Sequence, residues 1–177
     1  GLQRTSLEGL RRARHEQHPF YPLAGHMVDV PREAPGRDEL LAAVPVAIER
    51  AARRMHEPDM GEFEGLPALR RLAAEIGDWP ADAPDWQWCA RFNYQVIERR
   101  GTGGSNFRSM YSRFLREVGR GDESDLALVA AEAWSALATD LYAASETEEP
   151  DPAGWRRIAS ATAEVLAAEE RLWEALG

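Results

Sequence analysis

The sequence predicts an all-α protein: a compact bundle of about six helices, with an irregular, proline-rich arm at its N-terminal end. Apolar residues recur every three to four positions along most of the 177 residues, which is the spacing of a buried helix face. No segment shows the alternating pattern of a pair of β-strands. Hydrophobic residues make up 44% and charged residues 29% of the chain, a balance typical of a folded globular domain.

Each helix is expected where an apolar stripe begins and ends. The stripes predict helices over residues 7–14, 40–55, 66–76, 86–97, 107–118, 126–141 and 155–176. Pro45 interrupts the second stripe, so that helix either kinks at the proline or begins close to it. Gly77, with Pro80 beyond it, is expected to end the third helix, and Asp85 is expected to cap the fourth.

Residues 15–36 differ from the rest of the chain. Four prolines fall in this segment without a sustained apolar period, which predicts an extended arm or loop. We therefore expect two parts, with residues 1–36 as an N-terminal helix and arm and residues 37–177 as the helical domain. The spacing of the arm's histidines matches no metal-ligand pattern, so no metal site and no cofactor are predicted. These histidines are His15, His18 and His26.

Charge and composition exclude several classes of protein. The net charge of −9 and the pI of about 5.0 argue against general nucleic-acid binding, because that function needs a basic face. No apolar run approaches the roughly 20 residues that span a bilayer, and no signal peptide is visible, so we expect a cytoplasmic protein that binds no membrane.

Cysteine and lysine usage narrows the chemistry further. The single cysteine, Cys89, excludes a disulfide framework, and its place on an apolar stripe predicts an unreactive core thiol. All 21 residues counted as Lys or Arg are arginines, which excludes Schiff-base chemistry on a lysine. Together with the abundant alanine, this bias indicates a GC-rich genome, as in actinobacteria.

The arginines are concentrated in one stretch. Between residues 99 and 120 six arginines accompany a single acid, whereas residues 121–151 hold nine acids and no arginine. A positive stretch in an acidic chain predicts one of two arrangements. Either the arginines bind a small anionic group, or the two oppositely charged segments pack side by side and neutralise each other.

A glycine-rich segment, ERRGTGGSNF over residues 98–107, lies between two of the predicted helices. Its glycines end one helix and allow positive φ angles. Ser105 or Asn106 is expected to cap the next helix, whose free N–H groups and dipole favour an anion. The segment therefore predicts a binding site for phosphate, sulfate or carboxylate made by the amides of Gly101, Thr102, Gly103, Gly104 and Ser105.

Arg108 falls in the first turn of that next helix, where its positive charge opposes the helix dipole at a cost on the order of a few tenths of a kcal/mol. A partner anion would offset the cost, so Arg108 is a candidate substrate-binding residue through a forked contact. The alternative is a glycine turn that binds nothing, in which Arg108 pairs with Glu98.

Glu169 interrupts the apolar stripe of the last helix. Its carboxylate must either find a partner or face an interface.

Residues 94–117, YQVIERRGTGGSNFRSMYSRFLRE, are similar to the signature of a bacterial domain of unknown function. The family pattern is aromatic-x-x-I-E-x-R-G-T-G-G-x-x-F-R-x-x-Y-x-x-F-L-x-E. That domain usually follows the amino-terminal domain of butirosin biosynthesis protein H-like proteins. Fainter similarity extends to residues 7–14, to residues 65–79 and to the last predicted helix.

The resemblance implies a transferase-type role in secondary metabolism, as in antibiotic biosynthesis. The butirosin protein moves an acyl group from a carrier-protein thioester to an aminoglycoside amine. In that family the nucleophilic cysteine belongs to the amino-terminal domain, which we expect this chain to lack. We therefore expect one component of a two-chain or two-domain enzyme, a heteromer in which this chain helps to bind an anionic or carrier-protein-linked substrate.

Three other functions remain open at this point. The chain could be the small subunit of a two-subunit enzyme that closes an aziridine ring by eliminating sulfate. It could be a non-catalytic module that docks an acidic carrier protein through its arginines. It could also be a purely structural helical domain in which the glycine turn is only a connection.

Three further residues of the motif are candidate site residues. Glu98 stands one turn before the glycines and is the candidate catalytic residue, a general base that accepts a proton from an attacking amine. Tyr94 and Tyr111 are candidates for orienting a substrate. The structural alternatives are a helix-end salt bridge for Glu98 and core packing for the two tyrosines.

Overall fold

The computed structural model describes residues 6–15 and 34–177. These residues form helices joined by turns and contain no β-strand, which confirms the all-α prediction for this part of the chain. The chain divides into two units, Gly1–Gly36 and Arg37–Gly177.

The first unit contains helix α1, which spans Leu7–His15. The Ser6 hydroxyl accepts a hydrogen bond from the Gly9 N–H at 3.0 Å, which stabilises the start of this helix. Most of the predicted arm, with His18 and His26, lies outside the described residues.

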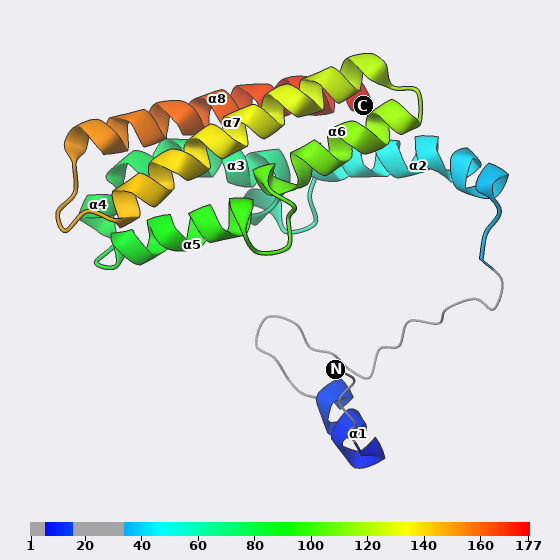
Figure 1. Cartoon of the computed structure of the whole chain (residues 1–177), viewed down its shortest axis with the longest axis horizontal. Helices are drawn as coiled ribbons and strands as arrows, with labels where there is room; N and C mark the ends of the chain where they lie inside the picture. Colours follow the sequence, from blue (N-terminus) through cyan, green and yellow to red (C-terminus); the bar gives the residue numbers. More distant parts are fainter. Residues whose placement is uncertain (1–5, 16–33) are drawn as a thin grey trace. The chain divides into compact units, whose positions relative to one another are not determined.

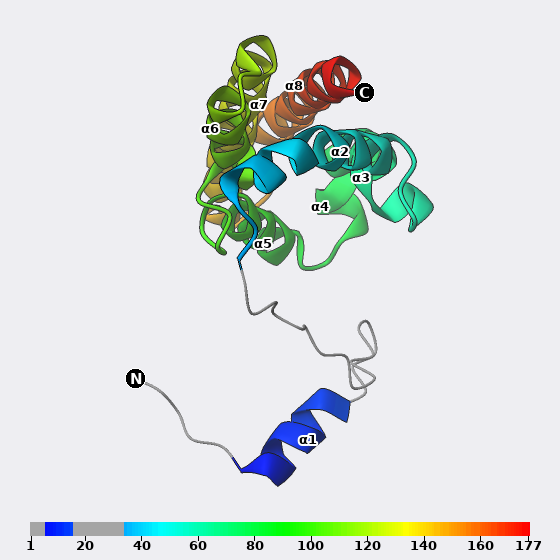
Figure 2. The same cartoon turned by 90° about the vertical axis from the view of Figure 1, so that its right-hand side faces the viewer.

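Two long antiparallel helices lie side by side in the second unit, and the other helices pack against them, as Figure 1 and Figure 2 show. Helix α7 spans Gly121–Ser145 and helix α8 spans Pro152–Leu176. Asp151 caps α8, because its carboxylate accepts hydrogen bonds from the N–H groups of Ala153 and Gly154, both at 2.9 Å.

Helices α5 and α6 lie one after the other along α7 (Figure 1). Helix α5 spans Trp86–Glu98 and helix α6 spans Arg108–Glu117. Arg91 of α5 pairs with Glu146 just beyond the end of α7, and Ser112 of α6 lies 3.1 Å from Ser124 near its start. The two short helices therefore run antiparallel to α7 as one interrupted helix, and the glycine-rich loop is the interruption.

Helices α2 and α3 pack against α8 (Figure 2). Helix α2 spans Arg37–His56, α3 spans Gly65–Glu75 and the short α4 spans Trp79–Asp82, with 3-10 turns at Gly61–Phe63 and Ile76–Asp78. Each predicted stripe falls within or at the edge of one of these elements, so the predicted helix positions are confirmed.

The structure differs from three expected details at helix ends. Helix α2 begins at Arg37, well before Pro45, so the alternative in which it begins close to the proline is wrong; the proline lies inside the helix and is tolerated because its surroundings are exposed and water can reach the unpaired carbonyl. Gly77 does not have a positive φ and does not terminate α3, which ends at Glu75. A 3-10 turn then leads into α4, where Pro80 fits the first turn. Asp85 precedes α5, but its carboxylate caps no N–H of that helix.

The buried apolar side chains of the second unit form two clusters. The first cluster contains, among others, Trp86, Trp134, Leu137, Leu141, Trp155 and Ile158. The second contains, among others, Ile48, Leu66, Leu115, Leu172 and Trp173. Both clusters take residues from α7 and α8, so these two helices carry the core along its whole length. None of the described helices combines the length and the apolar character that a membrane span needs.

A matched pair of leucines on α7 tests this core. Leu137 is fully buried, whereas Leu128 is 43% exposed. We expect Leu137→Ala to lower the free energy of unfolding by about 2–5 kcal/mol, because it leaves a cavity. Leu128→Ala should change it by no more than about 0.5 kcal/mol. Urea denaturation followed by circular dichroism measures both, and equal losses would contradict the placement of α7.

Candidate functional site

An ion pair lies at the centre of the helical unit. Arg108 is the first residue of α6, and its guanidinium forms a fork with the Glu169 carboxylate of α8. The Nε–Oε1 distance is 2.7 Å and the Nη2–Oε2 distance is 2.9 Å. The side chain of Glu169 has no exposed surface and that of Arg108 is 14% exposed. A carboxylate this deep in the protein needs such a partner to remain charged.

Two indole groups complete the coordination of this carboxylate. Trp134 donates its Nε1–H to Oε1 of Glu169, and Trp173 donates its Nε1–H to Oε2, both at 2.6 Å. Each carboxylate oxygen thus accepts two hydrogen bonds. The Arg108 guanidinium also lies 5.2 Å from the centre of the Trp173 ring, within the range of a cation–π contact. Trp134 belongs to the first core cluster and Trp173 to the second, so the network joins them.

The structure corrects the alternative in which Arg108 pairs with Glu98. The anion that offsets the unfavourable position of Arg108 at the start of α6 is Glu169, which lies 61 residues further along the chain. Glu169, which needed a partner or an interface, finds its partners inside the bundle.

The loop that delivers Arg108 is left-handed over most of its length. Its glycines have φ values of 80°, 68° and 86°, at Gly101, Gly103 and Gly104. Ser105, Asn106 and Phe107 follow with φ values of 54°, 48° and 67°. This conformation costs a non-glycine residue roughly 1–2 kcal/mol, so other contacts must hold these residues in place. Neither predicted cap residue caps α6, since the helix begins only at Arg108 and no side chain bonds its first amides.

Thr102 and Glu98 supply the contacts that hold the loop. The Thr102 hydroxyl donates to the carbonyl of Ile97 at 2.8 Å and accepts from the Gly104 N–H at 3.3 Å. The Glu98 carboxylate accepts from the Ser105 N–H at 3.2 Å. A Cβ added to Gly104 would lie 3.0 Å from Oε2 of Glu98, so only glycine fits there without displacing the carboxylate.

A chain of serine hydroxyls ties the loop to α7. The Ser135 hydroxyl donates to Oε1 of Glu98 at 2.7 Å and lies 3.1 Å from the Ser105 hydroxyl. Ser109 donates to Ser105 at 3.0 Å. The second half of the loop therefore binds a carboxylate of the chain itself. In the described part of the chain, the amides of Gly101, Thr102 and Gly103 have no acceptor.

A cavity of about 300 Å³ opens beside the ion pair. Its apolar wall comes from α2 and α3, and its polar corner comes from the loop, α6 and α8. The lining residues are Met55, Gly65, Ala68, Leu69, Leu72, Asn106, Arg108, Trp134 and Glu169. The Nη1 group of Arg108 makes only a long contact of 3.5 Å to the Asn106 carbonyl, so this edge of the guanidinium can still donate to a ligand.

The candidate residues Glu98 and Tyr94 lie together, but at a different cavity. They line a hollow of about 320 Å³ with Arg99, Ser135 and Thr139. The Tyr94 hydroxyl accepts a hydrogen bond from Nε of Arg99 at 3.1 Å, which raises the pKa of that guanidinium. Glu98 and Arg108 therefore face separate spaces on the two sides of the loop.

Tyr111 lines neither of these cavities. Its ring stacks on Trp173 and Phe114, with centroid distances of 5.5 and 5.8 Å. Its hydroxyl is buried without a partner in the described part of the protein. Burial raises the pKa of this hydroxyl, while Arg108 and Arg120 act in the opposite direction. These contacts describe a core aromatic residue beside the network.

The Cys89 thiol is poorly suited to nucleophilic chemistry. Burial raises its pKa, and the Asp85 carboxylate, 3.9 Å from the sulfur, raises it further. The reactive thiolate is therefore disfavoured, but the expected core position is wrong, because Cys89 is half-buried and belongs to neither core cluster. No cluster of potential metal ligands occurs among residues 6–15 and 34–177.

The arginine-rich stretch is partly neutralised by the acidic segment that follows it. Arg116 pairs with Asp125 at 2.8 Å, and Arg120 pairs with Glu123 at 2.7 Å. In the described part of the chain, Arg99, Arg100 and Arg113 form no salt bridge. The two charged segments thus pack together along α6 and α7, and a few arginines remain at the surface.

Sequence reasoning missed the indole donors and most of the cavity. Trp134 and the leucines of α3 lie on apolar stripes and look like ordinary core residues in the sequence. The one available signal was Glu169, because a carboxylate within an apolar stripe implies buried hydrogen-bond donors nearby.

Comparison with known proteins gives one match. The model of a family described as "Domain of unknown function (DUF4872)" matches residues 8–176. The searches of curated proteins and of solved structures give no match.

Adjacent glutamates on α8 allow a controlled test of the buried pair. Glu170 binds Arg70 at 2.7 Å, the same distance as in the Arg108–Glu169 pair, but its side chain is 41% exposed. Glu169→Gln should lower the free energy of unfolding by about 3–5 kcal/mol, because it leaves the Arg108 charge buried and unpaired. Glu170→Gln should cost no more than about 1 kcal/mol. Denaturant unfolding of both variants gives the comparison.

A double substitution separates the charge from the shape of the site. Arg108→Met combined with Glu169→Leu removes both charges and should recover much of the stability that Glu169→Gln loses. If Glu169→Gln were no more harmful than Glu170→Gln, the buried network would not exist in solution.

Proposed function

The chain belongs to the DUF4872 family, and we propose that it is the substrate-binding subunit or domain of a biosynthetic enzyme that works with a partner catalytic chain. Its substrate is an acyl compound, either a free acid or a carrier-linked thioester. The observation that carries this proposal is the cavity beside Arg108, which combines an apolar wall with a fixed polar corner. The biosynthetic context comes from the resemblance of residues 94–117 to the butirosin-associated signature.

The two sides of the cavity suit the two ends of an acyl group. The hydrocarbon part would lie against Leu69, Leu72 and Met55. The carbonyl or carboxylate oxygen would accept hydrogen bonds from Nη1 of Arg108 and from the amide group of Asn106. Because the fork to Glu169 fixes the guanidinium plane, these donors are oriented before the substrate arrives.

The same network favours a binding role over a catalytic one for this cavity. Both oxygens of Glu169 already accept two hydrogen bonds each, so this carboxylate has no free position to take a proton from a substrate. Glu98 holds the loop from the other side and acts as a positioning residue in this proposal. The groups that react with the substrate then belong to the partner chain.

The charge of the site bears on the aziridine alternative. Glu169 neutralises Arg108, so the cavity offers hydrogen-bond donors without a net positive charge. A carbonyl or a singly charged carboxylate fits this environment better than a departing sulfate does. We therefore place acyl binding ahead of sulfate elimination.

A series of acyl pantetheines tests this function. Their affinity for the chain, measured by calorimetry, should rise about fourfold per added methylene until the cavity is full, because each buried methylene contributes about 0.8 kcal/mol. Ala68→Phe fills the cavity and should abolish this dependence on chain length. Leu72→Ala enlarges the cavity and should move the optimum to longer acyl chains.

The matched control for the filling variant is Ala74→Phe, an exposed position on the same helix. It should bind the whole acyl series as the unmodified chain does. Equal affinities for all chain lengths, or an unchanged series in Ala68→Phe, would refute the acyl site. The partner is tested separately by co-expression with the product of the adjacent reading frame, where turnover should require both chains.

A second candidate function, docking of an acidic carrier protein, has one observation in its favour. Trp88 and Phe92 of α5 are 54% and 40% exposed, with ring centroids 6.1 Å apart. The Arg100 guanidinium lies 4.8 Å from the centre of the Phe92 ring. An exposed aromatic pair beside an arginine without a salt bridge is typical of protein interfaces.

Salt dependence tests this docking surface. An acidic carrier protein should bind the chain with an affinity that falls steeply as NaCl is added, because the contact depends on charge. Arg100→Gln should weaken binding, whereas Arg171→Gln, an exposed arginine on α8, should not. Binding that is insensitive to salt and to Arg100→Gln would exclude this surface.

A further inference from the structure

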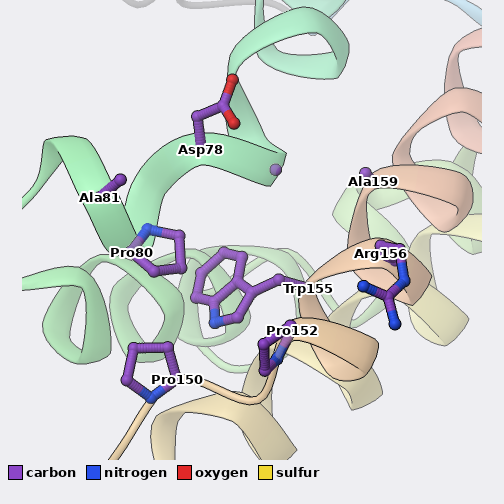
Figure 3. Close-up of a pocket in the computed structure, with 9 residues that line it drawn as sticks. Asp78, Pro80, Ala81, Pro150, Pro152, Trp155, Arg156 and Ala159 are labelled. Carbon is purple, nitrogen blue, oxygen red and sulfur yellow. The ribbon is translucent and has the colours of Figure 1, made fainter.

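A third cavity, of about 410 Å³, lies at the end of the bundle where the α7–α8 turn meets α4. Figure 3 shows its lining. Pro80, Pro150 and Pro152 form rigid apolar walls, and the indole of Trp155 lies between them. The cavity shares no lining residue with the cavity beside Arg108.

Trp155 is held firmly in the wall of this cavity. Only 3% of its surface is exposed. Its ring packs edge to face on Trp86 at a centroid distance of 5.8 Å, and against Trp79 at 6.3 Å. These contacts fix the direction of the indole N–H, which cannot turn toward another acceptor.

The indole N–H of Trp155 is buried and has no hydrogen-bond partner in the described part of the protein. Figure 3 places the nitrogen on the side of Pro150 and Pro152. The nearest capping carboxylate, Asp151, is engaged by the N–H groups of Ala153 and Gly154. Leaving such a donor unpaired costs about 1–3 kcal/mol, and buried donors are nearly always satisfied. An acceptor from outside the chain would satisfy this one.

The charges at the rim indicate what kind of acceptor. Arg156 lines the cavity, is exposed and forms no salt bridge within the described residues. Its long side chain can therefore turn toward a ligand. Asp78 also lines the cavity, and Figure 3 shows its carboxylate directed away from the indole. The space near Trp155 thus combines apolar walls, one orphan donor and one mobile positive charge.

We propose that this cavity binds a small carboxylic acid with a compact ring. The ring lies against the prolines, one carboxylate oxygen accepts the Trp155 N–H, and Arg156 supplies the opposite charge. Because the nitrogen has almost no exposed surface, binding requires the turn that carries Pro150 to move. The turn that carries Pro150 is exposed along residues 148–151, so a small movement there breaks no core contact.

Nuclear magnetic resonance of the isotope-labelled full chain tests this site with benzoate as the probe. The six tryptophans give separate indole N–H peaks, and Trp155→Phe identifies the peak of Trp155. Benzoate should move the Trp155 indole proton downfield in a saturable way, because the N–H gains an acceptor. Benzyl alcohol, which has a similar ring and no charge, should bind at least about fivefold more weakly. Should Trp155→Phe not fold, contacts to the protons of Pro150 and Pro152 identify the peak instead.

Neighbouring arginines give the matched control. Arg156→Gln should weaken benzoate binding about fivefold. Arg157→Gln should leave it unchanged, because Arg157 does not line this cavity but a smaller one of about 80 Å³. A Trp155 peak that no acid moves would overturn the proposal. Equal effects of the two arginine variants would also overturn the proposal. Neither result bears on acyl binding beside Arg108.

Discussion

The fold depends on satisfying one buried carboxylate. Glu169 lies on α8 with no exposed surface, and its two oxygens are neutralised by Arg108 and bonded by two indoles. An uncompensated charge at this depth would cost several kcal/mol, so α6, α7 and α8 must come together in one geometry to keep it paired. The network thereby sets the relative position of the two core clusters, which apolar packing alone would leave less strictly defined.

The glycine-rich loop brings Arg108 into the position from which it pairs with Glu169. Arg108 must enter the bundle at the point where α5 has ended and α6 begins, opposite the middle of α7. The left-handed residues make the turn, and Glu98, Thr102 and Ser135 offset their strain with hydrogen bonds. The motif therefore encodes a connection as well as a candidate site.

These intramolecular contacts change which ligands the glycine-rich motif can bind. The guanidinium is paired with Glu169 and the Ser105 amide with Glu98, whereas the amides of Gly101, Thr102 and Gly103 have no acceptor in the described part of the chain. The free edge of Arg108 lines a cavity of mixed character, and such a cavity recognises an uncharged or singly charged oxygen next to an apolar group. Ligand binding here is compatible with the stability of the fold, because the free edge of Arg108 is not needed to hold Glu169.

The positions of the helices and two unpaired charges could be predicted from the amino-acid sequence. Apolar periodicity depends only on local spacing, so it located the helices, and residue chemistry alone showed that Arg108 needs an anion and that Glu169 needs a donor. That these two residues pair with each other across 61 positions follows from the packing of α6 against α8, because a contact so distant in the chain has no periodic signal in the sequence. The same holds for the left-handed Ser105–Phe107 turn and for the unpaired indole of Trp155, since each is imposed by packing around it rather than by its own residue type.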